Sequence, residues 1–332
     1  MTEPLVSVKM ITYNHAPYIA RAIEGVLQQK TNFPFELIIG EDCSTDGTRE
    51  IVFGYQEKYP DIIRVVTSDK NVGMKKNGYR TVKACRGKYV AFCEGDDFWH
   101  HPLKVQKQAD YMESHPECGM VHSDYDVHHV ASGRVIKNYM KDRKFEVPIR
   151  PNICDIVESC RVSFRIQTCT VMVRRALSEQ IIESDPYLYL AGHFLMGDTQ
   201  LWAELSLFAE IAYIPESLAT YCLLGNSASG NKDKTRLWRF EKSHSEMLLY
   251  LCDKHGLPES IRKKNELSWC DSSLRLAFYE KNASLASEVR KKKNAFRWKE
   301  WLRYYGARNV VLRCFVRGGG LLFDVFRKEV IN

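Results

Sequence analysis

Three acidic side chains crowd around one glycine directly after an apolar run. The run Lys88–Cys93 has the composition of a buried strand, and the segment EGDDFW follows it at residues 94–99. Carboxylates this close together repel one another, and the neighbouring rings add to the cost of desolvating them. A positive partner is therefore expected at Asp96 and Asp97. The simpler alternative is a solvated acidic turn in which an aspartate caps a helix.

Two other polar segments end the apolar runs that precede this one. The residues TYN at 12–14 close the first run, and ED at 41–42 follows the second. The carboxyl ends of parallel strands gather at one edge of a sheet, where α/β proteins bind ligands. The sequence has neither a Gly-x-Gly-x-x-Gly loop nor a P-loop, so backbone amides alone cannot hold phosphates there. A divalent cation between the carboxylates and a diphosphate would satisfy both groups.

The elements that must position these acids alternate along the chain. Apolar runs and helical spacing predict strands at 6–12, 35–40, 62–67 and 88–93, and helices at 18–29, 44–59, 77–86 and 101–115. This alternation predicts right-handed βαβ units and a mostly parallel sheet with helices on both faces. Further strands are predicted at 119–123, 168–173 and 211–214, and a helix is predicted to begin near Asp198. Residues after 231 are predicted to be almost entirely helical.

Composition and charge limit the classes of protein. The 332 residues include eleven cysteines without a C-x-x-C pair, and no long apolar run suggests a signal peptide or a membrane span. Reduced thiols and a cytoplasmic location are expected. Residues 1–231 carry a net charge of −4, whereas residues 232–332 hold 23 Lys/Arg against 12 Asp/Glu, a net charge of +11. An acidic front and a basic tail predict different partners for the two parts.

Several ordered motifs resemble one enzyme family. The stretches VSVKMITYNH, FELIIGEDCSTDGT, NVGMKKN and GKYVAFCEGDDFW resemble the inverting glycosyltransferases of family 2, which have the GT-A fold. The resemblance covers about residues 5–225. It implies a GT-A catalytic domain over 1–230, with a nucleotide-sugar half at 1–100 and an acceptor half at 101–230. Residues 231–332 then form a helical, basic C-terminal region.

The resemblance also assigns the donor site. It implies a nucleotide-diphospho-sugar, with a UDP-sugar favoured, and Mn²⁺ or Mg²⁺. Asp42 matches the carboxylate that reads the base, and Asp96 matches the metal-binding aspartate of a D-x-D segment in which Glu94 replaces the first Asp. The remaining residues matched to the donor or metal site are Thr12, Tyr13, Asn14, Glu41, Asn71, Asn77 and Asp97. For Asn71 and Asn77, a turn and a helix cap are equally good explanations.

An inverting transfer needs one carboxylate near the acceptor hydroxyl to take its proton. In the segment LMGDTQLWAEL at 195–205, the resemblance gives that role to Asp198. Asp198 is also a good helix N-cap, and the two roles are compatible. His193 is the alternative base, and Glu204 is expected on the helix surface. Trp99, Gln167 and Thr168 are predicted on the acceptor side.

One departure from the family pattern leaves a second interpretation open. Many relatives have Tyr-Arg-x-His where this chain has Tyr221-Cys222-Leu223-Leu224, so the Arg and the His are missing. The chain is therefore predicted to be either an active transferase or a catalytically impaired GT-A scaffold that binds sugar nucleotides or membrane. A polar loop at Asn226, Ser227 and Ser229 is expected to close over the donor.

The basic tail contains an aromatic stripe. Trp298, Trp301, Leu302 and Tyr305 follow helical spacing near Lys291-Lys292-Lys293. This pattern suits an amphipathic helix on the anionic inner face of the cytoplasmic membrane, where a lipid-linked acceptor would be found. The alternative is that these rings pack on the protein while the cations stay in water. The acceptor is expected to be a glycan or a lipid-linked saccharide, and nucleic acid is not expected as a partner because the acidic edge would repel phosphates.

Overall fold

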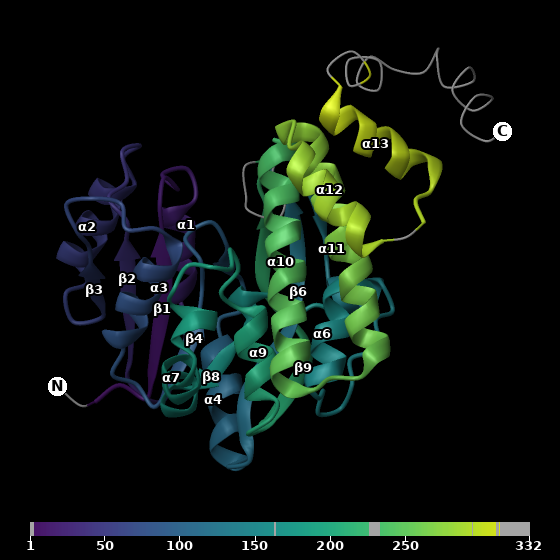
Figure 1. Cartoon of the computed structure of the whole chain (residues 1–332). Helices are drawn as coiled ribbons and strands as arrows, with labels where there is room; N and C mark the ends of the chain where they lie inside the picture. The colour runs from purple at the N-terminus through teal and green to yellow at the C-terminus, as the bar shows by residue number, and fades with distance from the viewer. Residues whose placement is uncertain (1–2, 163, 226–232, 294, 310–311, 313–332) are drawn as a thin grey trace. The chain divides into compact units, whose positions relative to one another are not determined.

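The computed structural model describes residues 3–162, 164–225, 233–293, 295–309 and 312. Its contacts divide the chain into two compact units (Figure 1). Unit 1 spans Met1–His193 and Gly197–Leu224, and unit 2 spans Phe194–Met196 and Gly225–Asn332. The chain therefore leaves unit 1 for three residues just before Asp198 and then returns to it.

The first half of the unit 1 sheet is parallel. Its strands are β1 (Val6–Thr12), β2 (Phe35–Glu41), β3 (Ile63–Val66) and β4 (Tyr89–Phe92), in the order β3-β2-β1-β4. They alternate with α1 (Ile19–Leu27), α2 (Thr48–Lys58) and α3 (Met74–Lys83). All seven elements were predicted from the sequence, and only their ends differ. The carboxyl ends of β1, β2 and β4 lie at the same edge of the sheet because these strands are parallel.

The second half of the sheet is mixed. The order continues through β8 (Met172–Arg174), β6 (Cys118–His129), β9 (Glu210–Leu223) and β5 (Phe98–Trp99), and β7 (Arg134–Ile136) pairs with β6. The β4–β8, β6–β8, β6–β7 and β5–β9 pairs are antiparallel, whereas β6 and β9 run parallel. The predicted strand at 168–173 is wrong over its first residues, where Thr168–Thr170 form a 3₁₀ turn. Strands β6 and β9 are longer than predicted because they pair with each other rather than ending at local turns.

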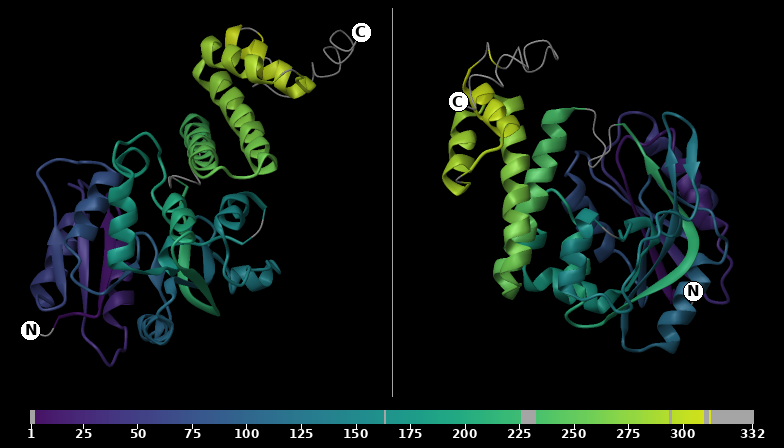
Figure 2. Two further views of the ribbon diagram at one scale, coloured as in Figure 1. Left: turned by 60° about the horizontal axis from the view of Figure 1, so that its bottom comes forward. Right: turned by 90° about the vertical axis from the view of Figure 1, so that its right-hand side faces the viewer.

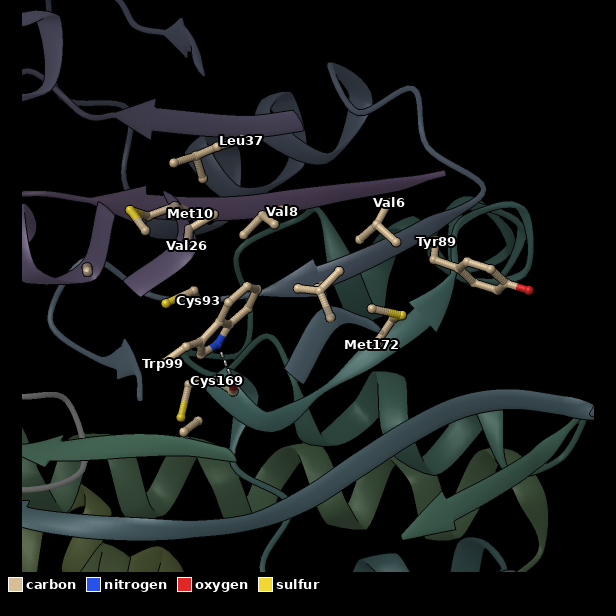
Figure 3. Close-up of a cluster of buried hydrophobic side chains, with 14 of the residues drawn as sticks. Val6, Val8, Met10, Val26, Leu37, Tyr89, Cys93, Trp99, Cys169 and Met172 are labelled. Atoms are coloured by element: carbon tan, nitrogen blue, oxygen red, sulfur yellow. Dashed lines mark hydrogen bonds between the residues drawn. The ribbon is translucent and has the colours of Figure 1, made fainter. Parts of the chain in front are cut away.

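Helices cover both faces of this sheet. Val8 and Met10 of β1 lie in the main core cluster with Val26 of α1, and with residues of α4 (Lys104–Ser114). Trp99 lies in the same cluster, where its indole N–H donates to the Cys169 carbonyl at 2.8 Å (Figure 3). On the opposite face are α3, α7 (Arg175–Ser184) and α9 (Thr199–Leu205). Burying each large apolar side chain of this cluster stabilises the fold by about 1.5–3 kcal/mol.

The remaining helices of unit 1 lie in the part of the chain that forms the mixed half. They are α5 (Tyr139–Asp142), α6 (Ile153–Val162) and α8 (Pro186–Tyr189). A small apolar cluster on β6 includes Tyr125, Val127, Met140 and Phe164. Asp124 of β6 accepts the backbone N–H groups of Met140 at 2.9 Å and Lys141 at 3.2 Å, which fastens α5 to the strand.

Unit 2 is helical. Helices α10 (Lys234–His255) and α11 (Glu259–Glu280) form an antiparallel hairpin, and α12 (Ala283–Lys292) and α13 (Trp298–Arg308) follow (Figure 2). Gly256 ends α10 with a φ of 58°, a conformation that glycine adopts without strain. A core of α11, α12 and α13 side chains, including Trp269, Val289 and Ala307, joins these helices. No helix in the described residues is both long and apolar enough to cross a membrane.

The three residues of the chain before Gly197 are held by α10. The Leu195 N–H donates to Ser243 Oγ at 2.9 Å, and the Phe194 ring lies 5.8 Å from the Tyr250 ring. Both contacts fall within unit 2. The backbone that leads to Asp198 is therefore anchored on a helix that follows it in the sequence.

Candidate active site

Glu41, the last residue of β2, holds the turn that follows this strand. Glu41 is completely buried, and its carboxylate accepts the Ser44 N–H at 2.6 Å and the Thr67 hydroxyl at 2.9 Å. The Arg49 guanidinium lies 3.6 Å from it. These bonds use both carboxylate oxygens of Glu41 to join β2, β3 and α2. The donor role predicted for Glu41 stays a prediction, whereas its structural role is visible.

Asp42 closes the loop ahead of α3. Its two carboxylate oxygens accept the N–H groups of Val72 and Gly73, both at 2.9 Å, and Arg80 lies 3.5 Å away. Asn71 is exposed and caps the Gly73 N–H at 3.0 Å. Asp42 and Asn71 therefore meet in one loop at the carboxyl edge, and their contact with a nucleoside stays a prediction.

Asn77 occupies a different environment from Asn71. It is buried, donates to the Gly40 carbonyl at 2.7 Å, and accepts from Arg80 at 2.9 Å. Both of its polar groups are thus used to hold α3 against β2. Asn77 lies inside α3, so it is not the turn or cap residue that the sequence offered as the alternative, and contact with the donor stays a prediction.

The end of β1 and the acidic segment meet closely. A Cβ on Gly95 would lie only 2.7 Å from Thr12 Oγ1, so this contact requires glycine. Thr12 is buried beneath it, whereas the Tyr13 side chain is 44% exposed. Asn14 adopts a φ of 54°, and its side chain accepts the Thr45 N–H at 2.9 Å. Tyr13 and Asn14 are therefore the residues at this end of β1 that are open to a ligand.

Asp96 and Asp97 of the acidic segment have different environments. Asp97 is buried and accepts the Cys222 N–H at 2.7 Å, so it fastens the segment to β9. Burial, followed by Asp96 and Glu94, raises the pKa of Asp97 well above its usual range. Asp96 is partly exposed, and its carboxylate lies 4.0 Å from His15 Nε2. Metal binding by Asp97 stays a prediction, and the geometry makes Asp96 the first candidate.

Glu94 interacts electrostatically with both the metal candidate Asp96 and the predicted base Asp198. Burial raises its pKa to about 7; the nearby Lys9 opposes this rise, and Asp96 and Asp198 add to it. One of its carboxylate oxygens is buried without a hydrogen-bond partner. A buried carboxylate oxygen that lacks a donor is costly in a finished site, which suggests that a ligand completes this one.

The residues fit a divalent cation that is shared with a substrate. The described residues hold no cluster of three His, Cys, Asp or Glu side chains that could bind a metal by themselves. Mg²⁺-type ions need only one or two carboxylates when substrate phosphates supply the other ligands. Asp96, with the unsatisfied oxygen of Glu94 nearby, meets that requirement.

Asp198 is held at both oxygens of its carboxylate. It is the N-cap of α9, accepts the Thr199 N–H at 2.6 Å and accepts the Thr168 hydroxyl at 2.8 Å. The predicted cap is therefore confirmed, and it leaves Asp198 half-buried and fixed in orientation. Thr168, predicted on the acceptor side, contacts Asp198 directly, and Gln167 is the partly exposed residue next to it.

Three neighbouring side chains bear on the other expectations. Trp99 is fully buried in the core, a position from which it can support the wall of the site, and its place on the acceptor side stays a prediction. Glu204 is also buried, and its carboxylate accepts a hydrogen bond from the Tyr189 hydroxyl at 3.0 Å. The expected surface position is wrong because residues 200–205 of α9 are all buried. The His193 ring is exposed and its centre lies 4.2 Å from that of the Tyr187 ring; its role as the alternative base stays a prediction. The loop at Asn226, Ser227 and Ser229 lies outside the described residues.

Sequence reasoning missed two cationic or titratable side chains at this edge. His15 faces Asp96 directly after the TYN segment, and Lys9 faces Glu94 from the middle of β1. The signal for Lys9 was visible, since a charged residue interrupts an otherwise apolar strand. His15 gave little signal, because one histidine in a loop is common.

Comparison with known proteins identifies the class. The family model described as Glycosyl transferase family 2 matches residues 7–180. TuaG of Bacillus subtilis strain 168, provisionally named a teichuronic acid biosynthesis glycosyltransferase, is 31% identical over 233 residues, or 70% of this chain and 84% of that one. The uncharacterised protein Rv1520 of Mycobacterium tuberculosis H37Rv is 33% identical over 262 residues, covering 77% and 71% of the two chains. The chain therefore belongs to glycosyltransferase family 2.

Solved structures agree on the fold. Staphylococcus aureus TarS, residues 1–349 with UDP-GlcNAc, superposes with a TM-score of 0.55 at 18% identity over 91% of this chain and 79% of that chain. The mannosyltransferase PcManGT of Pyrobaculum calidifontis, solved with GDP-Man and Mn²⁺, gives 0.53 at 14% identity over 95% and 87%. The predicted α/β GT-A fold is confirmed, and the protein is a glycosyltransferase.

Proposed function

We propose that this enzyme transfers a sugar, with inversion, from a nucleotide-diphospho-sugar to a glycan or lipid-linked acceptor in surface polysaccharide synthesis. The observation that carries the proposal is the placement of Asp198, which is capped, oriented by Thr168 and electrostatically linked to Glu94 beside the Asp96 edge. A UDP-sugar is favoured because Asp42 and the Asn71 loop match the base-reading end of the family. The UDP-GlcNAc bound by TarS is consistent with that choice.

The residues divide the reaction between two carboxylates. Asp96, with Glu94 close to it, would hold Mn²⁺ or Mg²⁺, which neutralises charge on the departing nucleoside diphosphate when it is bound. Asp198 takes the proton of the acceptor hydroxyl as that oxygen attacks the anomeric carbon from the face opposite the diphosphate. The Thr168 hydroxyl donates a hydrogen bond to one oxygen of Asp198 and so fixes the orientation of the carboxylate. No protein acid is needed for the leaving group.

The missing Arg and His after Tyr221 had left an impaired scaffold as an alternative. In their place, the Cys222 N–H binds Asp97, so this part of β9 holds the acidic segment through its backbone. His15 lies near Asp96 from another strand end. These contacts favour an active enzyme.

A donor screen tests the proposal. UDP-, GDP- and dTDP-sugars are incubated with the full chain and Mn²⁺, and release of the nucleoside diphosphate is followed with and without candidate acceptors. We expect release with a UDP-sugar, and NMR of the product to show inversion at the anomeric carbon. Retention of configuration, or no turnover of any donor despite binding, would exclude the proposed reaction.

We also propose that unit 2 contacts an anionic membrane surface. The Trp298 and Tyr305 rings are 45% and 48% exposed, whereas Trp301 packs on Phe296 at 5.2 Å. Cations accompany the rings, with the Lys299 ammonium 5.3 Å from the Trp298 ring and the Arg290 guanidinium 5.3 Å from the Trp301 ring. The predicted stripe is thus partly packed and partly exposed. Exposed rings with adjacent cations suit the headgroup region of anionic lipid, close to a lipid-linked acceptor.

A further inference from the structure

Unit 2 contains a pocket of about 780 Å³ that is lined by residues of α11 and of the first half of α13, two helices that pack on each other (Figure 1). Among the residues that the structure describes, four cationic side chains and two acidic ones line it, an excess of two positive charges. The rest of this lining is aromatic. The charged and aromatic residues are Asp271, Arg275, Phe296, Arg297, Trp298, Lys299, Glu300, Trp301 and Arg303.

Two arginines of this α11–α13 pocket share one carboxylate. Asp271 accepts a hydrogen bond from Arg275 Nε at 2.7 Å and another from Arg303 Nη1 at 3.2 Å. The Arg275 guanidinium also lies over the Trp238 ring, 4.4 Å from its centre. These contacts hold the two guanidinium groups near each other, and Asp271 balances the charge of only one of them.

The second acid of the pocket is used by the protein itself. Glu300 is buried, and its carboxylate accepts the Arg297 backbone N–H and the Lys293 ammonium, both at 2.7 Å. Its charge is therefore balanced within the fold. Burial, followed by the nearby Arg275, lowers the pKa of the Arg303 guanidinium, and Asp271 and Glu300 oppose this change. An anion bound beside the two arginines would relieve their mutual repulsion.

A phosphate group suits this lining. Guanidinium groups bind phosphate oxygens through paired N–H donors, and two neighbouring arginines can grip one phosphate. A phosphomonoester carries a charge of about −1.5 to −2 near neutral pH, which matches the excess of positive charge in the pocket. The Trp298 and Trp301 rings offer apolar surface beside that charge, and indole rings favour the membrane interface. Phosphate and hydrocarbon occur together in a membrane lipid.

We propose that the α11–α13 pocket binds the terminal phosphate of a membrane lipid, with Arg275 and Arg303 holding the phosphate and Trp298 and Trp301 beside the adjoining carbons of the lipid. This inference rests on the proposed membrane contact of unit 2, and it names the lipid group and the residues that recognise it. A lipid held in this way is selected by its phosphate, so binding should depend on the headgroup as well as on surface charge.

Vesicle binding by the full chain tests the headgroup dependence. One set of phosphatidylcholine vesicles contains phosphatidic acid, whose phosphate is terminal. A second set contains enough phosphatidylglycerol to give the same surface potential. We expect about tenfold tighter binding to the first set, because charge-assisted hydrogen bonds form only with phosphate oxygens that the arginines can reach. Equal binding to both sets would overturn the proposal and leave a general charge attraction of unit 2.

Variants assign the preference to the pocket. Arg303→Gln should abolish the preference for phosphatidic acid, and Arg303→Lys should lose most of it, because an ammonium lacks paired donors. Arg262→Gln is the matched control. Arg262 also bonds two acids, Asp253 at 2.9 Å and Glu266, but lies outside the described lining of the pocket. It should weaken binding to both sets equally. Retention of the preference by Arg303→Gln, or its loss in Arg262→Gln, would contradict the site.

A second measurement needs neither vesicles nor a variant, so it decides even if circular dichroism shows that Arg303→Gln does not fold. Dihexanoyl phosphatidic acid, kept below its micelle concentration, is titrated into the full chain with isotope-labelled arginine, and the Nε signals are followed by NMR. We expect saturable shifts of Arg275 and Arg303 and a weaker response to inorganic phosphate. An equal response to inorganic phosphate would overturn the lipid assignment, and no response to either probe would overturn the site.

These outcomes are separate from those of the proposed function. Neither measurement reads sugar transfer, so loss of the proposed reaction would not change them. A chain that binds neither set of vesicles but responds to the short-chain lipid would support the pocket and contradict the general membrane contact of unit 2.

Discussion

Two pairs of acidic residues differ in the hydrogen bonds that the protein gives to their carboxylates. The first pair, Glu41 and Asp42, lies at the end of β2, and the second, Glu94 and Asp96, follows β4. Glu41 and Asp42 receive four hydrogen bonds from backbone N–H groups and a hydroxyl, with guanidinium groups beside them. Glu94 keeps a buried oxygen without a partner, and Asp96 has only a distant histidine. The first pair is completed by folding, whereas the second awaits a ligand. Removing the charge of Glu41 should therefore damage stability, whereas removing that of Asp96 should damage chemistry.

The largest effect is expected at Asp96. Asp96→Asn removes the first metal candidate while keeping its size, so donor turnover should be nearly abolished and the fold retained. Calorimetry with Mn²⁺ plus donor, and a turnover assay, measure this. The variant should keep the wild-type melting temperature, because Asp96 makes few contacts in the fold. Full wild-type turnover in excess EDTA would contradict a metal role for this edge.

Asp198→Asn should come next. Asparagine caps a helix as well as aspartate does, so α9 should remain intact. Without the carboxylate, the transfer rate should fall by roughly 10²–10⁴, whereas donor affinity stays near normal. A transfer assay and donor titration on this variant separate base from cap. Thr168→Val, which removes only the hydroxyl bond, should lose less. Wild-type transfer by Asp198→Asn would require another base.

Glu41→Gln should show the opposite behaviour. A hydrogen bond to a buried charge is worth about 1.5–3 kcal/mol, so loss of the charge facing Ser44 and Arg49 should lower the free energy of unfolding by a similar amount. Urea denaturation measures it, and nucleotide affinity at low temperature should change little. If the variant is as stable as wild type but binds UDP weakly, Glu41 belongs with the ligand-binding acids and the comparison fails.

The smallest effect is expected in unit 2. Replacing Trp298 and Tyr305 together by Ala should weaken binding to liposomes that contain anionic lipid by about tenfold, the factor given by roughly 1.4 kcal/mol. Sedimentation with liposomes, repeated at high salt to screen the charges, measures this. Leu267→Ala is the control, because Leu267 is an exposed apolar residue of α11. Equal binding by both variants would show that the rings do not anchor the protein.

The parallel half of the sheet was predictable because each of its elements is defined locally. Val6–Thr12 and its successors alternate with helical spacing over short distances. Strands β6 and β9 depend on pairing between residues about 90 positions apart, which no local pattern reveals. Trp99 shows the same limit at one residue. Its position after three acids placed it beside the acidic segment, but the sequence could not show that its partner is the carbonyl of Cys169, seventy residues away.

The candidate site was predictable to the extent that it rests on motif order. Asp42, Asp96 and Asp198 fall at the expected strand and helix ends. The separation of Asp97 from Asp96 was not foreseeable, because it depends on the Cys222 N–H of a distant strand.

The anchoring of Leu195 on Ser243 and of Phe194 near Tyr250 has a consequence for the order of folding. A nascent chain that has reached residue 224 contains every strand of unit 1, yet the segment before Asp198 still lacks the helix that holds it. The contacts of Phe194 and Leu195 are therefore completed only after α10 has been synthesised. In hydrogen-exchange measurements, the amide of Leu195 should lose protection together with α10 and not with α9, the helix that Asp198 caps.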